Sequence, residues 1–117
     1  MIKSYKELEV YRYSYELAIQ IYKITDRYPK GEIYGIISQV RRAAVSIVLN
    51  IAEGYGRKSK EEFKRFLKIS LGSLYETKTL IDMSRDLEYI DEEIYNELAD
   101  KYDILARKVY MLMIKWK

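Results

Sequence analysis

The segment 39–56, which reads QVRRAAVSIVLNIAEGYG, constrains the fold of this chain more than any other stretch. Apolar residues between 33 and 55 recur at a helical period and predict a helix with one stripe facing a core. Val45, Val48, Leu49 and Ala52 also cover the flank and part of the back of that helix. A helix that is apolar nearly all round is a buried helix. In a chain of 117 residues, we expect the second burying surface to come from another copy of the same chain.

Four helices account for the apolar periodicity of the whole chain, and we predict them at about 5–28, 32–53, 60–88 and 92–116. Ser4, Ser59 and Asp91 stand where N-caps are expected. Pro29 interrupts the first helical pattern. Because the connections are short, successive helices should pack as antiparallel neighbours. The sequence therefore predicts a single all-α domain, 1–117, folded as an up-down-up-down four-helix bundle.

Two glycines carry specific expectations. Gly54 is placed to end the second helix in the left-handed cap conformation. Gly72 falls in the middle of the third helix, where glycine costs about 1 kcal/mol relative to alanine. We expect the close approach of another helix to compensate for that cost.

Composition excludes several classes of site. The chain has no cysteine and no histidine, so it lacks disulfides, thiolate metal sites, the commonest metal ligand and the commonest general base. No stretch has the glycine spacing of a phosphate-binding loop. We therefore predict a non-enzymatic protein with no metal and no cofactor. No apolar run reaches the roughly 18 residues of a membrane span, so we expect a soluble cytoplasmic protein without a membrane partner.

Three runs of sequence resemble one known family. GIISQVRRAAVSIVLNIAEGYGR, FKRFLKISLGSLYET and KELEVYRYSYELAIQIYKITDRYP are similar to the four-helix-bundle proteins encoded in intervening sequences of bacterial 23S ribosomal RNA genes. The resemblance implies an antiparallel bundle that assembles as a ring, commonly a homopentamer, with a role in binding nucleic acid. Val48 and Leu49 stand where the family often has proline and serine. The second helix should therefore be straighter here, because proline bends a helix.

Charge is distributed unevenly along the predicted bundle, although the net charge is only +3. The start of the first and third helices and the end of the second and fourth would share one pole, where basic residues outnumber acidic ones. A ring would align these poles into one basic face that can bind phosphate backbone with little reading of sequence. The candidate nucleic-acid-binding residues are Arg42, Arg57, Lys58, Lys60, Lys64, Arg65 and Lys68.

Each candidate also has a structural interpretation. For the lysines of the third helix, we favour a solvated helix face over a contact with nucleic acid. Arg57 and Lys58 lie on a loop, and for them we weigh the two roles equally. We expect Arg41 to pair with a carboxylate across a subunit interface, and Arg42 to face either solvent or a ring lumen. The candidate oligomer-interface residues are Arg41, Val45, Val48, Leu49 and Ala52.

Two functions from different classes fit these observations. The first is a homo-oligomeric protein that binds RNA or DNA through the basic pole or the lumen. The second is an oligomeric scaffold that docks a protein partner through an apolar or tyrosine-rich surface, with no nucleic-acid ligand. Aromatic rings can stack on unpaired bases, but most of the 13 tyrosines fall on or beside core stripes, so we expect them in the core or an interface. Only Tyr13 and Tyr55 are expected to be exposed near basic residues.

Overall fold

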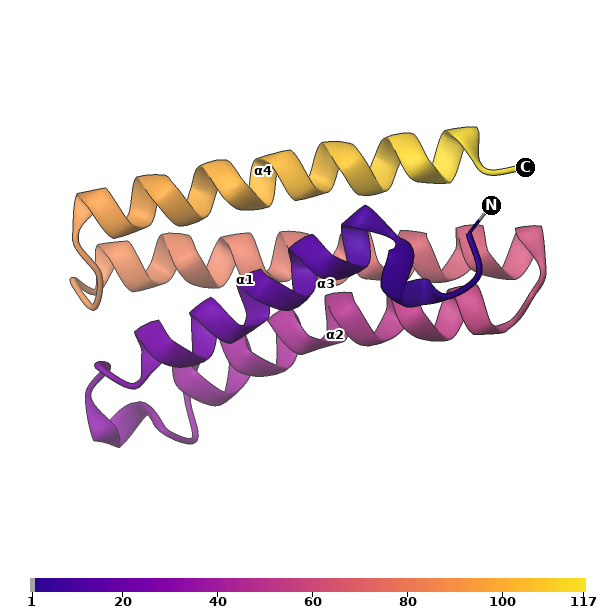
Figure 1. Ribbon diagram of the computed structural model, residues 1–117. Coiled ribbons are helices and arrows are strands. Elements are labelled where there is room, and N and C mark those ends of the chain that lie inside the picture. Colours follow the sequence, from indigo (N-terminus) through magenta and orange to yellow (C-terminus); the bar gives the residue numbers. More distant parts are fainter. Residues whose placement is uncertain (1) are drawn as a thin grey trace.

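The computed structural model describes residues 2–117, which form helices and no strand (Figure 1). The four α-helices are α1 (Glu9–Thr25), α2 (Ile36–Gly56), α3 (Lys60–Asp86) and α4 (Glu92–Lys115). Two 3₁₀ turns, Tyr5–Glu7 and Lys30–Glu32, precede α1 and α2. The prediction of an all-α chain with four helices is confirmed.

Each helix packs against two others. α2 contacts α1 and α3, and α4 contacts α3 and α1, whereas no Cα atoms of the pairs α1–α3 and α2–α4 come within 8 Å of each other among residues 2–117. Figure 1 shows both chain ends and the α2–α3 turn at one end of the molecule, with the other two connections at the opposite end. We call the first end, made of residues 2–7, 55–60 and 115–117, the terminal pole. The molecule is elongated, with extents of 44 × 24 × 19 Å.

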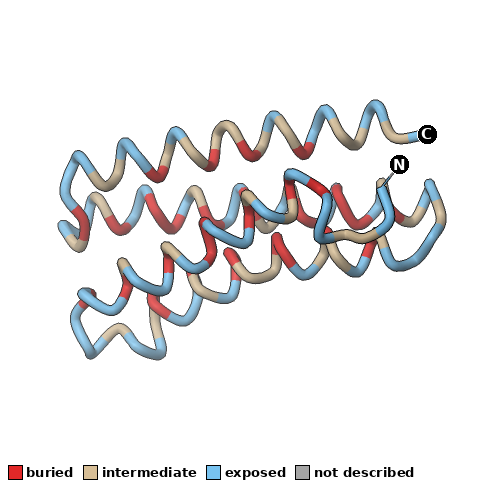
Figure 2. The backbone as a smooth tube through the Cα atoms, in the orientation of Figure 1, coloured by how far each residue is buried: buried red, intermediate tan, exposed pale blue. Residues whose placement is uncertain are grey.

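The core consists of buried residues from all four helices, which Figure 2 marks in red along the backbone. α2 contributes Ile47 and Ile51, and α4 contributes Leu105 and Val109. The hydroxyl of Ser70 on α3, also buried, donates a hydrogen bond of 2.9 Å to the Ile47 carbonyl and ties α3 to α2. None of the helices in residues 2–117 combines the length and the apolar character needed to cross a membrane.

The predicted caps of α3 and α4 are confirmed. The Ser59 hydroxyl accepts a hydrogen bond from the Glu62 amide at 3.3 Å, and the Asp91 carboxylate accepts one from the Ile94 amide at 2.8 Å. The predicted start of the first helix at residue 5 is wrong. Ser4 caps only the 3₁₀ turn, and Leu8 is extended, so α1 begins at Glu9.

Both glycine predictions, the left-handed cap at Gly54 and the close helix approach at Gly72, are wrong. Gly54 lies inside α2, which continues to Gly56, and the chain turns on Lys58 with a φ of 56°. A Cβ on Gly54 would lie 2.5 Å from Cβ of Phe66, whereas a Cβ on Gly72 would meet nothing within 4 Å. The close approach of two helices that was expected at Gly72 therefore occurs at Gly54, between α2 and α3.

Candidate nucleic-acid interface

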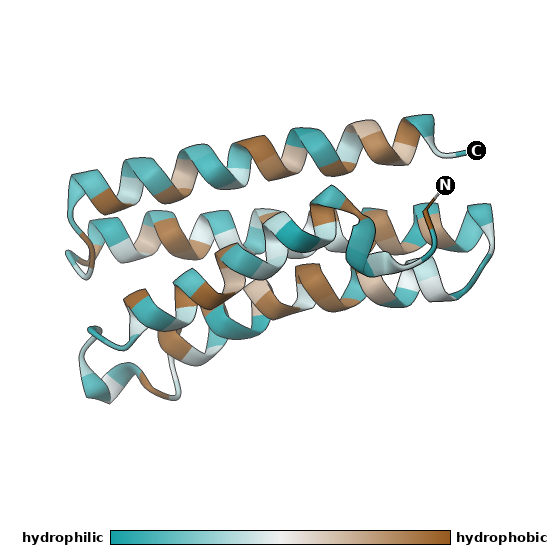
Figure 3. Cartoon of the chain, viewed as in Figure 1, coloured by the Kyte–Doolittle hydropathy of each residue, from teal (hydrophilic) through white to brown (hydrophobic). Residues whose placement is uncertain are grey.

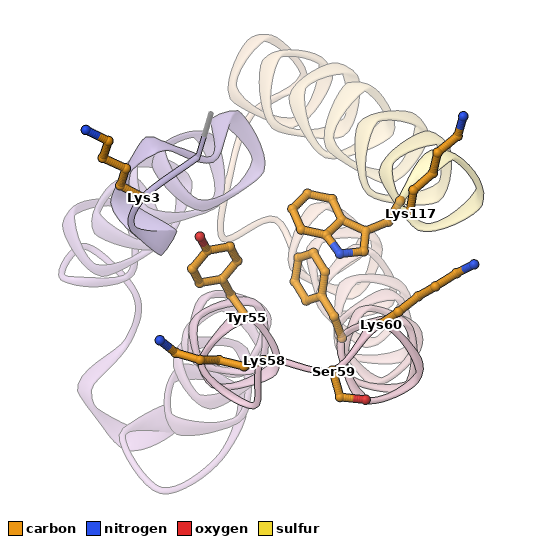
Figure 4. Close-up of a pocket in the computed structure, with 8 residues that line it drawn as sticks. Lys3, Tyr55, Lys58, Ser59, Lys60 and Lys117 are labelled. Carbon is orange, nitrogen blue, oxygen red and sulfur yellow. The ribbon is translucent and has the colours of Figure 1, made fainter.

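A pocket of about 350 Å³ opens at the terminal pole, where the end of α2, the start of α3 and both chain ends meet (Figure 4). We call it the pole pocket. Its lining consists of Lys3, Tyr55, Lys58, Ser59, Lys60, Phe63, Trp116 and Lys117. These residues come from segments far apart in the sequence, which the reversals of the chain bring to one end.

Three aromatic rings form the floor of the pole pocket. Phe63 is 2% exposed and holds the other two rings edge to face, with centroids 4.7 Å from Trp116 and 5.9 Å from Tyr55. The Tyr55 hydroxyl donates a hydrogen bond of 3.1 Å to the Ile2 carbonyl, which fixes the N-terminal segment beside the pocket. Edge-to-face pairs at these distances are favourable, so the three rings support one another and give the pocket an apolar floor.

Four lysines surround this aromatic floor: Lys3, Lys58, Lys60 and Lys117. Figure 4 shows their side chains extending outward in different directions from the aromatic rings. None of the four ammonium groups forms an ion pair with a carboxylate of residues 2–117. Their positive charge is therefore available to an anionic ligand.

Arg57 and Arg65, by contrast, already have acidic partners. Arg57 pairs with Glu53 at 2.8 Å and with Glu62 at 3.7 Å, and Arg65 pairs with Glu62 at 2.9 Å. The hydrogen bond from Arg65 holds the pKa of Glu62 below its ordinary value, so Glu62 remains a carboxylate near neutral pH. Both guanidinium groups also lie over the Phe66 ring. Carboxylates on the same surface thus compensate much of their charge.

The fold and most of the chain match a known family. The model of the 23S rRNA-intervening sequence protein family matches residues 6–111. This chain belongs to that family. It is also similar in structure to a protein of unknown function from the S23 ribosomal protein family of Bacteroides thetaiotaomicron VPI-5482, with a TM-score of 0.79 and 24% identity. The similarity covers 89% of this chain and 97% of the other. No curated protein matches this chain.

In this member of the 23S rRNA-intervening sequence protein family, Lys64 and Lys68 extend the basic surface along α3. They follow Lys60 at intervals of four residues, so the three lysines lie in a row on one side of the helix. Neither Lys64 nor Lys68 forms an ion pair within the described part of the chain, residues 2–117. The predicted residues Lys58, Lys60, Lys64 and Lys68 therefore form one surface with the pole pocket.

Arg42 does not join that surface. It is exposed on α2, fifteen residues before Arg57, which places it roughly 22 Å from the terminal pole at 1.5 Å per helical residue. There it lines a separate hollow with Leu49 and Glu53. The structure thus separates Arg42 from the other predicted nucleic-acid-binding residues.

An apolar groove of about 280 Å³ between α1 and α2 contains four of the five predicted interface residues. Its lining consists of Tyr5, Tyr11, Tyr15, Ala18, Ile19, Tyr22, Val45, Val48, Leu49 and Ala52. Figure 3 shows hydrophobic bands along both helices. Leu49 is 61% exposed, whereas Val48 is only 7% exposed because its own chain already covers it. Leu49 therefore offers the larger surface to another molecule.

Arg41 finds its partners within its own chain. Its Nε donates to the Thr25 hydroxyl at 2.8 Å, and its Nη2 donates to the Tyr22 carbonyl at 3.3 Å and to Asp26 Oδ1 at 3.1 Å. The carboxylate expected across an interface is thus replaced by Asp26 at the end of α1. Within one chain, Arg41 therefore joins α1 to α2.

Phe63 and Trp116 fall on the apolar patterns of the third and fourth helices, and neither is among the residues predicted for the site. Trp116 is the last apolar residue of the α4 pattern and lies just beyond the end of that helix. An aromatic residue at the very end of a core stripe has neighbours on one side only. That position is the sequence signal that could have indicated a pocket.

Proposed function

We propose that this chain acts without catalysis, as a homo-oligomer of antiparallel four-helix bundles that binds the backbone of RNA or DNA through the terminal pole. The four lysines around the pole pocket carry this proposal, because all of them line the same pocket and none has an acidic partner in residues 2–117. Lysine contacts to phosphate are independent of sequence and supply most of the affinity in non-specific nucleic-acid binding.

The charge of the opposite pole supports this orientation. Exposed acidic residues gather at the end of α3 and the start of α4, namely Asp86, Glu88, Asp91, Glu92 and Glu93. A polyanion is repelled by that end and attracted to the terminal pole. The bundle should therefore approach nucleic acid with its terminal pole first.

Assembly would multiply this effect. A closed ring uses a heterologous interface, in which two different surfaces of the same chain meet. The apolar groove between α1 and α2 is one such surface, and the exposed side chains Tyr110, Met111 and Ile114 on α4 provide a second. In a homopentamer built this way, all terminal poles would point in the same direction and form one basic face.

A scaffold for a protein partner is the second candidate, and the same apolar groove favours it. Tyrosines on a groove wall are typical of protein interfaces. A pulldown from lysate of the source cells after nuclease treatment separates the two functions. A scaffold keeps a protein partner after nuclease treatment, whereas a nucleic-acid-binding protein loses what it held.

Binding to labelled RNA and DNA at increasing salt concentration tests the proposed function. The logarithm of the binding constant should fall linearly with the logarithm of salt concentration, by about 0.7–0.9 for each phosphate contact. The double variant Lys58→Glu, Lys60→Glu should weaken binding about tenfold or more, since it replaces two phosphate contacts with repulsion. Absence of binding even at low salt would rule the function out.

The matched control is Lys23→Glu combined with Lys30→Glu. Both lysines are exposed, lie away from the terminal pole and form no ion pair within residues 2–117. This double variant changes the net charge by the same amount, so it separates a local effect of the pole pocket from an overall charge effect. Equal loss of binding in both double variants would contradict a site at the terminal pole.

A further inference from the structure

We propose that the pole pocket holds one unpaired nucleotide, with its base against the aromatic rings and its phosphates among the lysines. This inference rests on the proposed function and names the form of nucleic acid that the site takes. It implies that the protein binds single strands in preference to duplexes. The observation behind it is that one pocket combines a floor of aromatic side chains with lysine ammonium groups that form no ion pair.

The dimensions of the pocket fit a single nucleotide. A volume of about 350 Å³ lies at the lower end of the range, roughly 300–1,000 Å³, in which small-molecule ligands are bound. A base inside a duplex is covered on both faces by its neighbours and cannot enter a pocket unless it leaves the stack. The pocket therefore discriminates by the pairing state of the base rather than by its identity.

Trp116 is the residue best placed to meet a base. It follows the end of α4 with an extended backbone, and Phe63 supports its ring edge to face at 4.7 Å. Its indole is only partly buried and forms part of the pocket wall. Stacking of a base on an aromatic ring tolerates any sequence, because every base has a π-face.

The lysines surround the aromatic rings from separate segments of the chain. Lys3 precedes the first 3₁₀ turn, and its backbone amide donates to Glu7 at 2.9 Å, which fixes its position. Lys58 and Lys60 flank the cap residue of α3, and Lys117 follows Trp116 (Figure 4). The phosphates on the two sides of an unpaired nucleotide would therefore meet different lysines.

Intrinsic fluorescence tests this directly, because Trp116 is the only tryptophan of the chain. We would titrate the protein with single-stranded RNA, with single-stranded DNA and with a duplex of the same length, all at the same salt concentration. Single strands should quench the tryptophan emission and bind about tenfold more tightly than the duplex, as expected where stacking on aromatic rings contributes to affinity. Quenching and preference together support the inference.

Two variants sharpen the test. Trp116→Leu should lower the affinity for single strands and leave the affinity for duplex unchanged, whereas Trp116→Phe should retain the preference because it keeps an aromatic face. Equal affinity of the unmodified protein for single strands and duplex, without quenching, would overturn the nucleotide pocket and leave backbone binding intact. Absence of binding to either form would instead overturn the proposed function, and the pocket assignment with it.

Discussion

At the scale of single residues, Gly54 is a position with no room for a side chain. A Cβ there would lie 2.5 Å from Cβ of Phe66 and 3.2 Å from Cδ1 of Phe63, so α2 and α3 would have to separate. Alanine favours a helix by about 1 kcal/mol over glycine, but overpacking costs about 1–3 kcal/mol. We expect Gly54→Ala to lower the free energy of unfolding by about 1–2 kcal/mol in urea denaturation.

Gly72→Ala is the matched control, because Gly72 is also helical but has open space where its Cβ would be. Only the helix propensity changes there, so the variant should be more stable than the unmodified protein by up to about 1 kcal/mol. Opposite signs for the two substitutions are the expected result. A stabilising effect of Gly54→Ala would mean that the α2–α3 contact is looser than the structure shows.

Tyr102 places a hydroxyl in the core without a hydrogen-bond partner among residues 2–117. The residue is 1% exposed, and a buried polar group left unsatisfied costs about 1–3 kcal/mol. Tyr102→Phe removes this group and keeps the ring. The variant should therefore unfold at a higher urea concentration, by about 1 kcal/mol in free energy. A loss of stability would indicate that the hydroxyl has a partner.

The same hydroxyl predicts a dependence on alkaline pH. Burial raises the pKa of Tyr102 above the ordinary value of 10.0, whereas in the unfolded chain the phenol ionises near that value. As the pH rises above about 10, the unfolded state loses this proton first, and the folded state becomes relatively less stable. Urea midpoints measured between pH 8 and 11 should fall more steeply for the unmodified protein than for Tyr102→Phe.

At the scale of helices, Arg41 is the main polar connection between α1 and α2. It bonds the buried hydroxyl of Thr25 and the Tyr22 carbonyl, one of the last acceptors of α1. Arg41→Met should cost about 1–2 kcal/mol, because the buried Thr25 hydroxyl loses its charged donor. Asp26→Ala should cost less than about 0.5 kcal/mol, since the Asp26 side chain is 80% exposed. Equal losses of stability in the two variants would mean that α1 and α2 are joined by the ion pair with Asp26 rather than by the hydrogen bond to the buried Thr25 hydroxyl.

The signals that predicted the helices were local, whereas the packing of one helix on another was not visible in the sequence. The caps at Ser59 and Asp91 depend on residues three positions away, so their spacing was visible in the sequence. The tight packing at Gly54 depends on Phe66 in another helix, and no periodicity within α2 contains that information. The start of α1 was misplaced because Ser4 also caps a 3₁₀ turn, which has the same cap chemistry as an α-helix.

At the scale of the whole molecule, the candidate site was predictable in part. Helix order alone brought Lys58 and Lys60 to one pole together with both chain ends. The pairing of Arg65 with Glu62 was predictable, because residues three apart lie side by side on a helix. The contact of Arg57 with Glu62 across the α2–α3 turn was not predictable from their spacing. The pole pocket was not predictable either. Its formation depends on the positions of α2, α3 and α4 along the bundle axis, which would have to be known to within one helical turn.

The apolar groove makes the last prediction, which concerns assembly. Leu49 is the groove residue with the largest exposed fraction, and a charge there would have to be buried when another chain covers it. Light scattering should give the unmodified protein about five times the 14.0 kDa of one chain, and Leu49→Glu should give a single chain with the same helix content. Met83→Glu is the control, because Met83 is an exposed apolar residue of α3 outside the groove.

Loss of assembly should also change binding. A single chain presents one set of pole lysines, whereas a ring presents several sets to the same strand, which raises the apparent affinity without any new contact. Leu49→Glu should therefore bind nucleic acid more weakly and with a shallower salt dependence, although it alters no residue of the pole pocket. If the unmodified protein has the mass of one chain at all concentrations, the groove has another occupant. Nucleic acid would then bind to the terminal pole of a single bundle.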